Sequence, residues 1–212
     1  MTVALLGCGA PAASPPGSAV DPSTPPGARS RGTPTASSEA PAQPAVPARR
    51  APSVVVPQPP VAARLPSGTV VAIREVSSRA DGELAVPEDV DTAGWWKGGA
   101  RLGDPFGSML VAAHIDSRTQ GLGPYAELLE ARPGERVRIF SRGLVQDFAI
   151  NRRRLVPQAP LTKEQSIFAP TGPARVTLVT CAPPYLRSEG GYQNLAVVTA
   201  VPVSQPRPRE AR

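Results

Sequence analysis

Proline is concentrated in the first third of the chain, and this limits how much of the chain can fold. Fifteen of the 28 prolines lie between Pro11 and Pro66, mixed with Ala, Ser, Gly and Thr. A segment with so few large apolar side chains cannot bury enough surface to offset its ordering entropy. We therefore expect a disordered tether over 9–65, one compact domain over 66–204 and a disordered tail over 205–212.

The formal net charge of +6 is carried mostly by the two ends of the chain. Basic residues outnumber acidic ones by five to two over 1–66, by 15 to 14 over 67–204 and by three to one over 205–212. Nucleic-acid-binding domains concentrate positive charge on the folded part. A nearly neutral domain with 4% aromatic residues therefore argues against nucleic acid as a partner.

Cysteine and histidine are scarce. The chain has two cysteines, Cys8 and Cys181, and a single histidine, His114. Both a disulfide framework and a zinc site built on paired cysteines need more than one cysteine in the domain. We expect no metal and no cofactor.

The first eight residues, 1–8, end like a lipobox, in which a short apolar run and a small residue precede a cysteine that becomes lipid-modified. The run is shorter than a signal peptide requires. One interpretation is a true start upstream of Met1 and an exported lipoprotein. The other is a chance Cys8 near a disordered end. No segment approaches the roughly 18 apolar residues of a membrane span.

Short runs rich in Val, Ile and Leu, separated by Gly- and Pro-containing turns, are typical of strands. They predict strands over 69–76, 83–86, 109–114, 136–139, 144–155, 175–181 and 195–203. Two short helices are expected over 124–131, which begins with Pro, and over 162–168, which begins with a capping-box pattern. Many short strands with little helix predict a mainly β fold, an antiparallel barrel or sandwich.

Cys181 and His114 are the residues best suited to chemistry. Each ends an apolar run and is followed by a loop-like segment, so each is expected where a strand reaches the mouth of the barrel. A free thiol is a poor nucleophile at neutral pH until a nearby cation lowers its pKa, and His114 is the obvious partner for this role. The pair is therefore a candidate cysteine acyl-transfer site, although a buried structural cysteine and a structural histidine are common alternatives.

The residues around this pair form a set of motifs. Thr-Leu-Val-Thr-Cys at 177–181 matches the Thr-Leu-x-Thr-Cys signature of sortases, and His114 lies 67 positions earlier. Four further segments resemble the actinobacterial class F sortases. They are 82–88 (Gly-Glu-Leu-Ala-Val-Pro-Glu), 94–99 (Gly-Trp-Trp-Lys-Gly-Gly), 113–117 (Ala-His-Ile-Asp-Ser) and 132–135 (Arg-Pro-Gly-Glu). The resemblance covers about 66–204 and implies a small closed β-barrel of about eight strands.

The resemblance also implies an activity. Cys181 would attack the bond between Thr and Gly of a Leu-Pro-x-Thr-Gly-like sorting signal, and His114 would act as general acid and base around a thioester intermediate. The implied partners are surface proteins that bear a sorting signal and an amine acceptor, such as a peptidoglycan precursor or a protein lysine. The implied location is extracytoplasmic, at the cell surface, with membrane attachment only through an N-terminal anchor.

The chain departs from the family at the arginine expected about a dozen residues after the cysteine. Gln193 or Asn194 occupies that place, and a neutral amide donates a hydrogen bond without a full charge. Arg187 could substitute for the missing arginine, or it could be a solvated surface residue. Ala113 also replaces the usual glycine before the histidine.

Two further segments carry open interpretations. The arginine run at 152–154 fits a solvated barrel edge better than a site for anionic wall polymers. Ile167 and Phe168 could contact the Leu and Pro of a sorting signal or fill the core. The alternative function for the whole chain is a non-catalytic exported β-barrel that binds peptides or cell-wall fragments.

Overall fold

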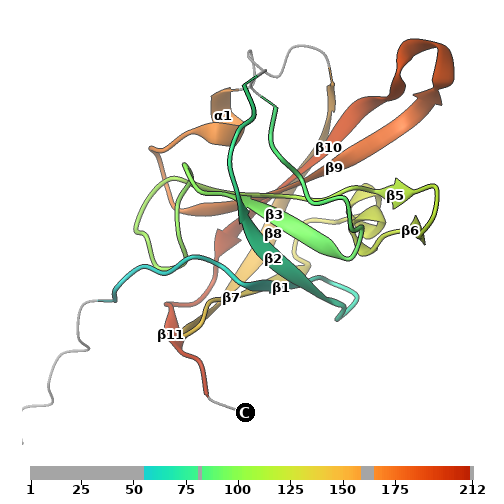
Figure 1. Ribbon diagram of the computed structural model, residues 1–212. Coiled ribbons are helices and arrows are strands. Elements are labelled where there is room, and N and C mark those ends of the chain that lie inside the picture. Colours follow the sequence, from blue (N-terminus) through green and yellow to red (C-terminus); the bar gives the residue numbers. More distant parts are fainter. Residues whose placement is uncertain (1–54, 81–82, 159–164, 211–212) are drawn as a thin grey trace, which may run out of the picture. The chain divides into compact units, whose positions relative to one another are not determined.

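The computed structural model describes residues 55–80, 83–158 and 165–210. Within them, eight strands close into a barrel (Figure 1). In chain order these are β1 (Ala62–Arg64), β2 (Val70–Val76), β3 (Thr92–Trp96), β4 (Ser108–Ala112), β7 (Arg136–Phe140), β8 (Leu144–Pro157), β9 (Arg175–Leu186) and β10 (Gly191–Pro202).

The order around the barrel is β10-β9-β4-β3-β2-β1-β7-β8, and a β10–β8 pairing closes it. β2–β3 and β4–β9 are parallel pairs, while the other neighbours are antiparallel. The mainly β fold and the closed eight-stranded barrel are thus confirmed.

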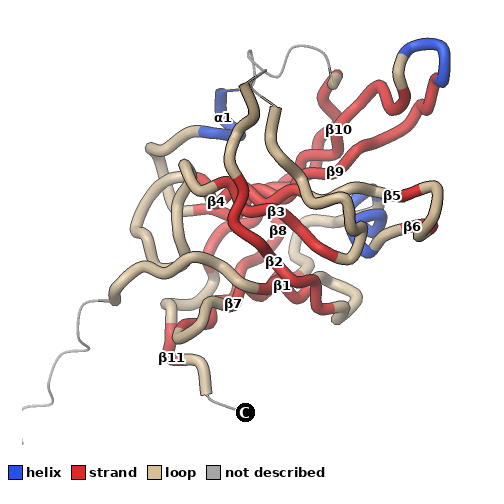
Figure 2. The backbone as a smooth tube through the Cα atoms, in the orientation of Figure 1, coloured by secondary structure: helices blue, strands red, loops and turns tan. Residues whose placement is uncertain are grey.

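The helices and the remaining strands are short (Figure 2). The helical elements are η1 (Pro124–Leu129), α1 (Gln165–Phe168) and η3 (Arg187–Glu189), and η1 and η3 are 3-10 helices. β5 (Asp116–Ser117) and β6 (Gly121–Leu122) form a two-stranded sheet of their own. The expected helix over 162–168 is seen only in its last four residues, because 159–164 lie outside the described residues.

One expected strand is absent, and several observed strands, β3 among them, were not expected. Residues 83–86 form no strand, and only an isolated bridge joins Leu84 to Ser78. β3 was missed because its sequence, Thr-Ala-Gly-Trp-Trp, lacks the β-branched run that indicates a strand. Its pairing with β2 and β4 decides its conformation.

The barrel begins earlier than residue 66, the expected start of the domain. β1 pairs with β2 on one side and with β7 on the other, and Ala63 and Leu65 are fully buried. The sequence did not reveal this strand because three residues beside prolines carry no alternation pattern. Residues 9–54 of the expected tether lie outside the described residues.

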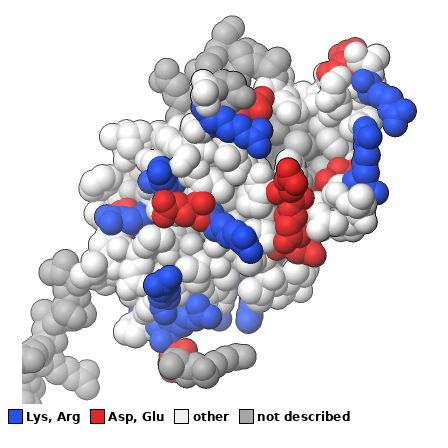
Figure 3. Space-filling view, viewed as in Figure 1, with Lys and Arg blue, Asp and Glu red and all other residues white. Residues whose placement is uncertain are grey.

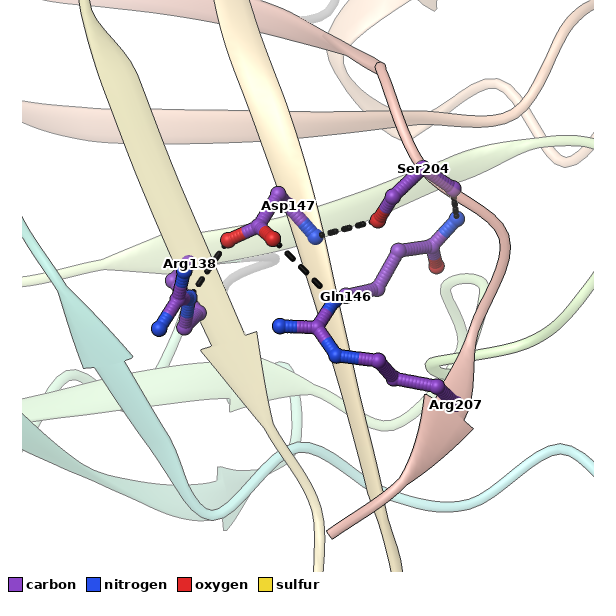
Figure 4. Close-up of polar contacts among 5 residues, drawn as sticks. All are labelled: Arg138, Gln146, Asp147, Ser204 and Arg207. Carbon is purple, nitrogen blue, oxygen red and sulfur yellow. Dashed lines mark hydrogen bonds and ion pairs between the residues drawn. The ribbon is translucent and has the colours of Figure 1, made fainter.

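The expected tail also contributes to the barrel. β11 (Arg207–Pro208) pairs with β8, and the Arg207 guanidinium donates to an Asp147 carboxylate oxygen at 3.1 Å. Figure 4 shows that Asp147 also accepts from Arg138 and that Ser204 contacts both Asp147 and Gln146. These contacts hold 204–208 against β8.

Side chains alternate between the interior and the outer face of the barrel wall. On β9, Val176 and Leu178 belong to the interior core, whereas Val179 and Cys181 belong to a second apolar cluster on the outer face. On β4, Val111 faces the interior. This second, outer cluster is the surface on which the candidate site is built.

The side chains of Trp95 and Trp96 likewise lie on opposite faces of the barrel wall. Trp95 is buried in the interior, and its indole N–H donates to the Ala100 carbonyl at 3.0 Å. Trp96 packs against the outer cluster, with its ring centroid 5.3 Å from that of Phe168 in an edge-to-face arrangement.

Candidate active site

Two neighbouring parallel strands carry the candidate catalytic pair. In the β4–β9 register Ala112 lies beside Val179, and the Ala113 N–H donates to the Val179 carbonyl at 3.1 Å. His114 follows the end of β4 by two residues, and Cys181 lies two residues beyond Val179 on β9, so continuation of this register would bring the two side chains close together. Because β4 and β9 run parallel, the segments that carry His114 and Cys181 lie at the same end of the barrel.

The outer face of the barrel is where Cys181 lies and where we expect His114. Leu110 and Ala112 of β4 lie in the outer cluster, as does Val179 of β9. Cys181 packs against the same cluster, and strand alternation continued past Ala112 predicts that face for His114 as well. Both residues are half-buried, so each is packed yet open to a ligand.

Buried threonines of the Thr-Leu-x-Thr-Cys motif join β9 to β4. The Thr180 hydroxyl donates to the Ala113 carbonyl at 2.9 Å, and Thr177 shares a 2.7 Å hydrogen bond with Ser108. Thr180 and Ala113 directly precede Cys181 and His114. The Thr180 bond therefore fixes the relative position of the two candidate catalytic residues.

The electrostatics of the site favour a protonated thiol. Burial, together with the nearby Asp116 carboxylate, raises the pKa of Cys181. Asp116 also accepts a 2.8 Å hydrogen bond from the Tyr192 hydroxyl, which ties β10 to the segment after His114. Burial and this bond raise the pKa of Tyr192 to about 12. In the free protein, Cys181 needs a base to become a nucleophile.

Apolar side chains wall the outer face next to Cys181. Ile167 of α1 is buried in the outer cluster, and Phe168, Leu84 and Val86 pack against it together with Cys181. Ile167 and Phe168 come from the β8–β9 connection, and Leu84 and Val86 from the β2–β3 connection. The arrangement provides an apolar surface beside the thiol.

The three expected oxyanion donors lie on the β9–β10 hairpin, which projects beyond the barrel (Figure 1). Asn194 donates to the Pro183 carbonyl at 2.6 Å, and Gln193 donates to the Gly191 carbonyl at 2.8 Å. Arg187 is exposed in η3 at the tip, six residues along β9 from Cys181, about 20 Å at the usual strand rise. The side-chain amides of Gln193 and Asn194 are therefore bonded to carbonyls within the hairpin.

Asp116 and Tyr192 are site residues that the sequence analysis did not single out. Asp116 lies two positions after His114 inside the Ala-His-Ile-Asp-Ser motif, so its proximity to the site was available as a signal. Tyr192 is brought to Asp116 only by the β9–β10 pairing. Among the described residues, no group of His, Cys, Asp and Glu is arranged to hold a metal ion.

The protein-family model of the sortase domain matches residues 67–203, well over half of the chain. This chain belongs to the sortase family. A comparison with curated proteins gives no significant match. The sortase assignment agrees with the barrel and with the position of the Thr-Leu-x-Thr-Cys motif at the end of β9.

Solved structures of sortases share this fold. Sortase E1 from Streptomyces coelicolor, solved with a tripeptide in its active site, is 18% identical over 72% of this chain and 91% of that chain, with a TM-score of 0.53. A sortase from Actinomyces oris is 19% identical over 74% of this chain and 87% of that chain, also with a TM-score of 0.53. Sortase A from Listeria monocytogenes is 12% identical over 73% of this chain and 92% of that chain, with a TM-score of 0.51. At these identities the likeness concerns the fold.

Proposed function

We propose that this sortase cleaves a Leu-Pro-x-Thr-Gly-like sorting signal between Thr and Gly and transfers the Thr carbonyl to an amine. The observation that supports the proposal is the β4–β9 pairing, because His114 and Cys181 each lie two residues beyond the paired residues Ala112 and Val179. The apolar surface next to Cys181 supports a peptide with Leu and Pro as the substrate.

In the first step, His114 takes the proton of the Cys181 thiol as the sulfur attacks the Thr carbonyl carbon. The carbon–nitrogen bond to Gly breaks as the carbon–sulfur bond forms, and the imidazolium of His114 returns its proton to the leaving amine. In the second step His114 takes a proton from the incoming amine, which attacks the thioester. A new amide forms and the thiol of Cys181 is restored.

Arg187 is our candidate for the cationic oxyanion donor in the substrate complex. The amides of Gln193 and Asn194 are both bonded to carbonyls of the hairpin, whereas Arg187 is exposed and its guanidinium has no polar partner within the described part of the chain. For Arg187 to act, the hairpin tip must fold toward Cys181 when substrate binds. Catalytic hydrogen bonds often form only in the substrate complex.

The class and the location are also proposals. The motifs at 82–88, 94–99, 113–117 and 132–135 support class F, and the acceptor is proposed to be a peptidoglycan precursor or a protein lysine. We place the enzyme at the cell surface, held through its N-terminal segment. Among the helices of the described residues, none has the length and apolar character to cross a membrane.

The test is turnover of a Leu-Pro-x-Thr-Gly peptide in the presence of an amine, with mass spectrometry of the product and of the intact protein. The wild-type chain should give the amide product and a thioester adduct. Cys181→Ala and His114→Ala should give neither. Cys8→Ala, which removes the chain's other thiol, is the matched control and should keep full activity.

Turnover by Cys181→Ala, or no thioester in the wild-type protein, would contradict the proposal. Tight binding of the peptide without turnover by any variant would instead support a non-catalytic peptide-binding barrel.

A further inference from the structure

Tyr192, near the start of β10, contacts the segment that follows β4. Its hydroxyl donates a 2.8 Å hydrogen bond to a carboxylate oxygen of Asp116, which is the first residue of β5 and the second residue after His114. Figure 1 shows β5 below the β9–β10 hairpin. The bond joins residues 76 positions apart in the chain, so it links the hairpin to the segment that carries the candidate general base.

The hairpin fixes the ring of Tyr192. Tyr185 lies opposite Tyr192 in the β9–β10 register, and the two rings meet edge to face with their centroids 5.0 Å apart. The register shifts directly after this pair, between Tyr192 and Asn194. The ring therefore packs within the hairpin, while its hydroxyl reaches across to Asp116.

His114 lies between two attachment points. On one side, the Thr180 hydroxyl of β9 donates to the Ala113 carbonyl at 2.9 Å. On the other side, the Tyr192 hydroxyl makes the one side-chain hydrogen bond of the Asp116 carboxylate with the described residues. Asp116 is exposed, so its side chain would turn freely in solvent without this bond.

The bond also bears on the thiol. The titratable groups that act on Cys181 are Asp116, from the segment after β4, and Tyr192, from β10, whereas the outer cluster packed against Cys181 is apolar. Burial and the Asp116 carboxylate raise the pKa of Cys181. A hydroxyl that donates to a carboxylate sets a partial positive charge beside it, which weakens the effect of the anion on its neighbours.

We propose that Tyr192 is a positioning residue of the candidate active site, which acts through Asp116 to hold the segment that carries His114 and to moderate the negative charge near Cys181. The inference deepens the proposed function and rests on it for the role of His114. The effect passes through a single hydrogen bond. Removing one hydroxyl group is therefore enough to test it.

Tyr192→Phe removes the hydroxyl and keeps the ring that packs against Tyr185. Tyr185→Phe is the matched control, because it removes the other hydroxyl of the same ring pair, which makes no hydrogen bond with the described residues. All variants are made in the full-length Cys8→Ala chain, so that Cys181 is the single thiol. Two quantities are measured: the pH midpoint of Cys181 alkylation by iodoacetamide, and kcat with a Leu-Pro-x-Thr-Gly peptide and an amine.

Tyr192→Phe should raise the alkylation midpoint by about half a pH unit, because the carboxylate of Asp116 loses its donor. It should also lower kcat at least about fivefold, because the segment that carries His114 loses an attachment. Tyr185→Phe should leave the midpoint unchanged and kcat within about twofold. In an Asp116→Asn chain, adding Tyr192→Phe should not move the midpoint further, because no carboxylate charge is left to moderate.

An unmoved midpoint or an unchanged kcat in Tyr192→Phe would overturn the inference. Equal effects in Tyr185→Phe, or the same shift of the midpoint in the Asp116→Asn chain, would overturn it too. Alkylation does not require turnover, so failure of the proposed function is recognised separately. A chain that shows the Asp116-dependent shift but never turns over the peptide would contradict the proposed catalysis and leave the link from Tyr192 to Cys181 standing. Turnover with no shift would do the reverse.

Discussion

Replacing Thr180 by Val tests whether the hydrogen bond between the two candidate catalytic strands positions the active site. Val is close to Thr in shape, and the change removes the donor of the 2.9 Å bond to the Ala113 carbonyl. Both residues are nearly inaccessible, with 2% and 4% of their surface exposed. In the variant the Ala113 carbonyl therefore loses its side-chain partner at a position where bulk water cannot replace it.

Losing one partner of a buried hydrogen bond costs about 1–3 kcal/mol. For a domain of this size, each kcal/mol lowers Tm by about 2–4 °C, so we expect Tm to fall by roughly 2–12 °C. The larger effect should be on catalysis. If the chain before His114 is free to shift relative to Cys181, the geometry of proton transfer is lost, and kcat should fall at least about tenfold.

Thr177→Val is the matched control. Thr177 is also 2% exposed on β9, and it bonds to β4 through Ser108 at 2.7 Å, but it lies four residues from Cys181. Its Tm should fall by a similar amount, because Ser108 is left buried without its partner, while kcat stays within about twofold. Thermal unfolding and steady-state peptide turnover are measured at a temperature where both variants are folded. Equal losses of kcat in the two variants would refute a positioning role for the Thr180 bond.

Three further predictions follow from the contacts of the site and of the barrel. Asp116→Asn removes the anion that helps to raise the pKa of Cys181, so the midpoint of the pH dependence of Cys181 alkylation should move to lower pH. An unchanged midpoint would show that burial alone raises this pKa. Arg187→Ala should lower kcat at least about tenfold and leave alkylation unchanged, and a change within about twofold would remove Arg187 from the oxyanion site. A chain that begins at Val55 should unfold cooperatively, whereas one that begins at Ser67 lacks β1 and should not; a sharp thermal transition in the shorter chain would show that the barrel closes without that strand.

Local pattern was sufficient for the elements that carry regular alternation. The β-branched runs of β2, β7, β8 and the first half of β9 matched strands within a few residues, because their own side chains favour an extended backbone. β1 and β3 were missed because their residues have no such preference, and their conformation comes from the strands on either side. Long-range pairing is not encoded in any short window of sequence.

For the candidate site, too, some features could be predicted from local sequence and others depended on the tertiary structure. Sequence alone predicted a mainly β fold, and the family motifs within it indicated a closed barrel and the candidate pair His114 and Cys181, because motif residues and strand ends are local properties. Only the tertiary structure decided that Asp116 bonds to Tyr192, that the amides of Gln193 and Asn194 are occupied within the hairpin, and that arginines of β8 and β9 share a pocket. These depend on register and on which strands become neighbours, since a charge or a hydrogen bond acts through distance in space rather than separation along the chain.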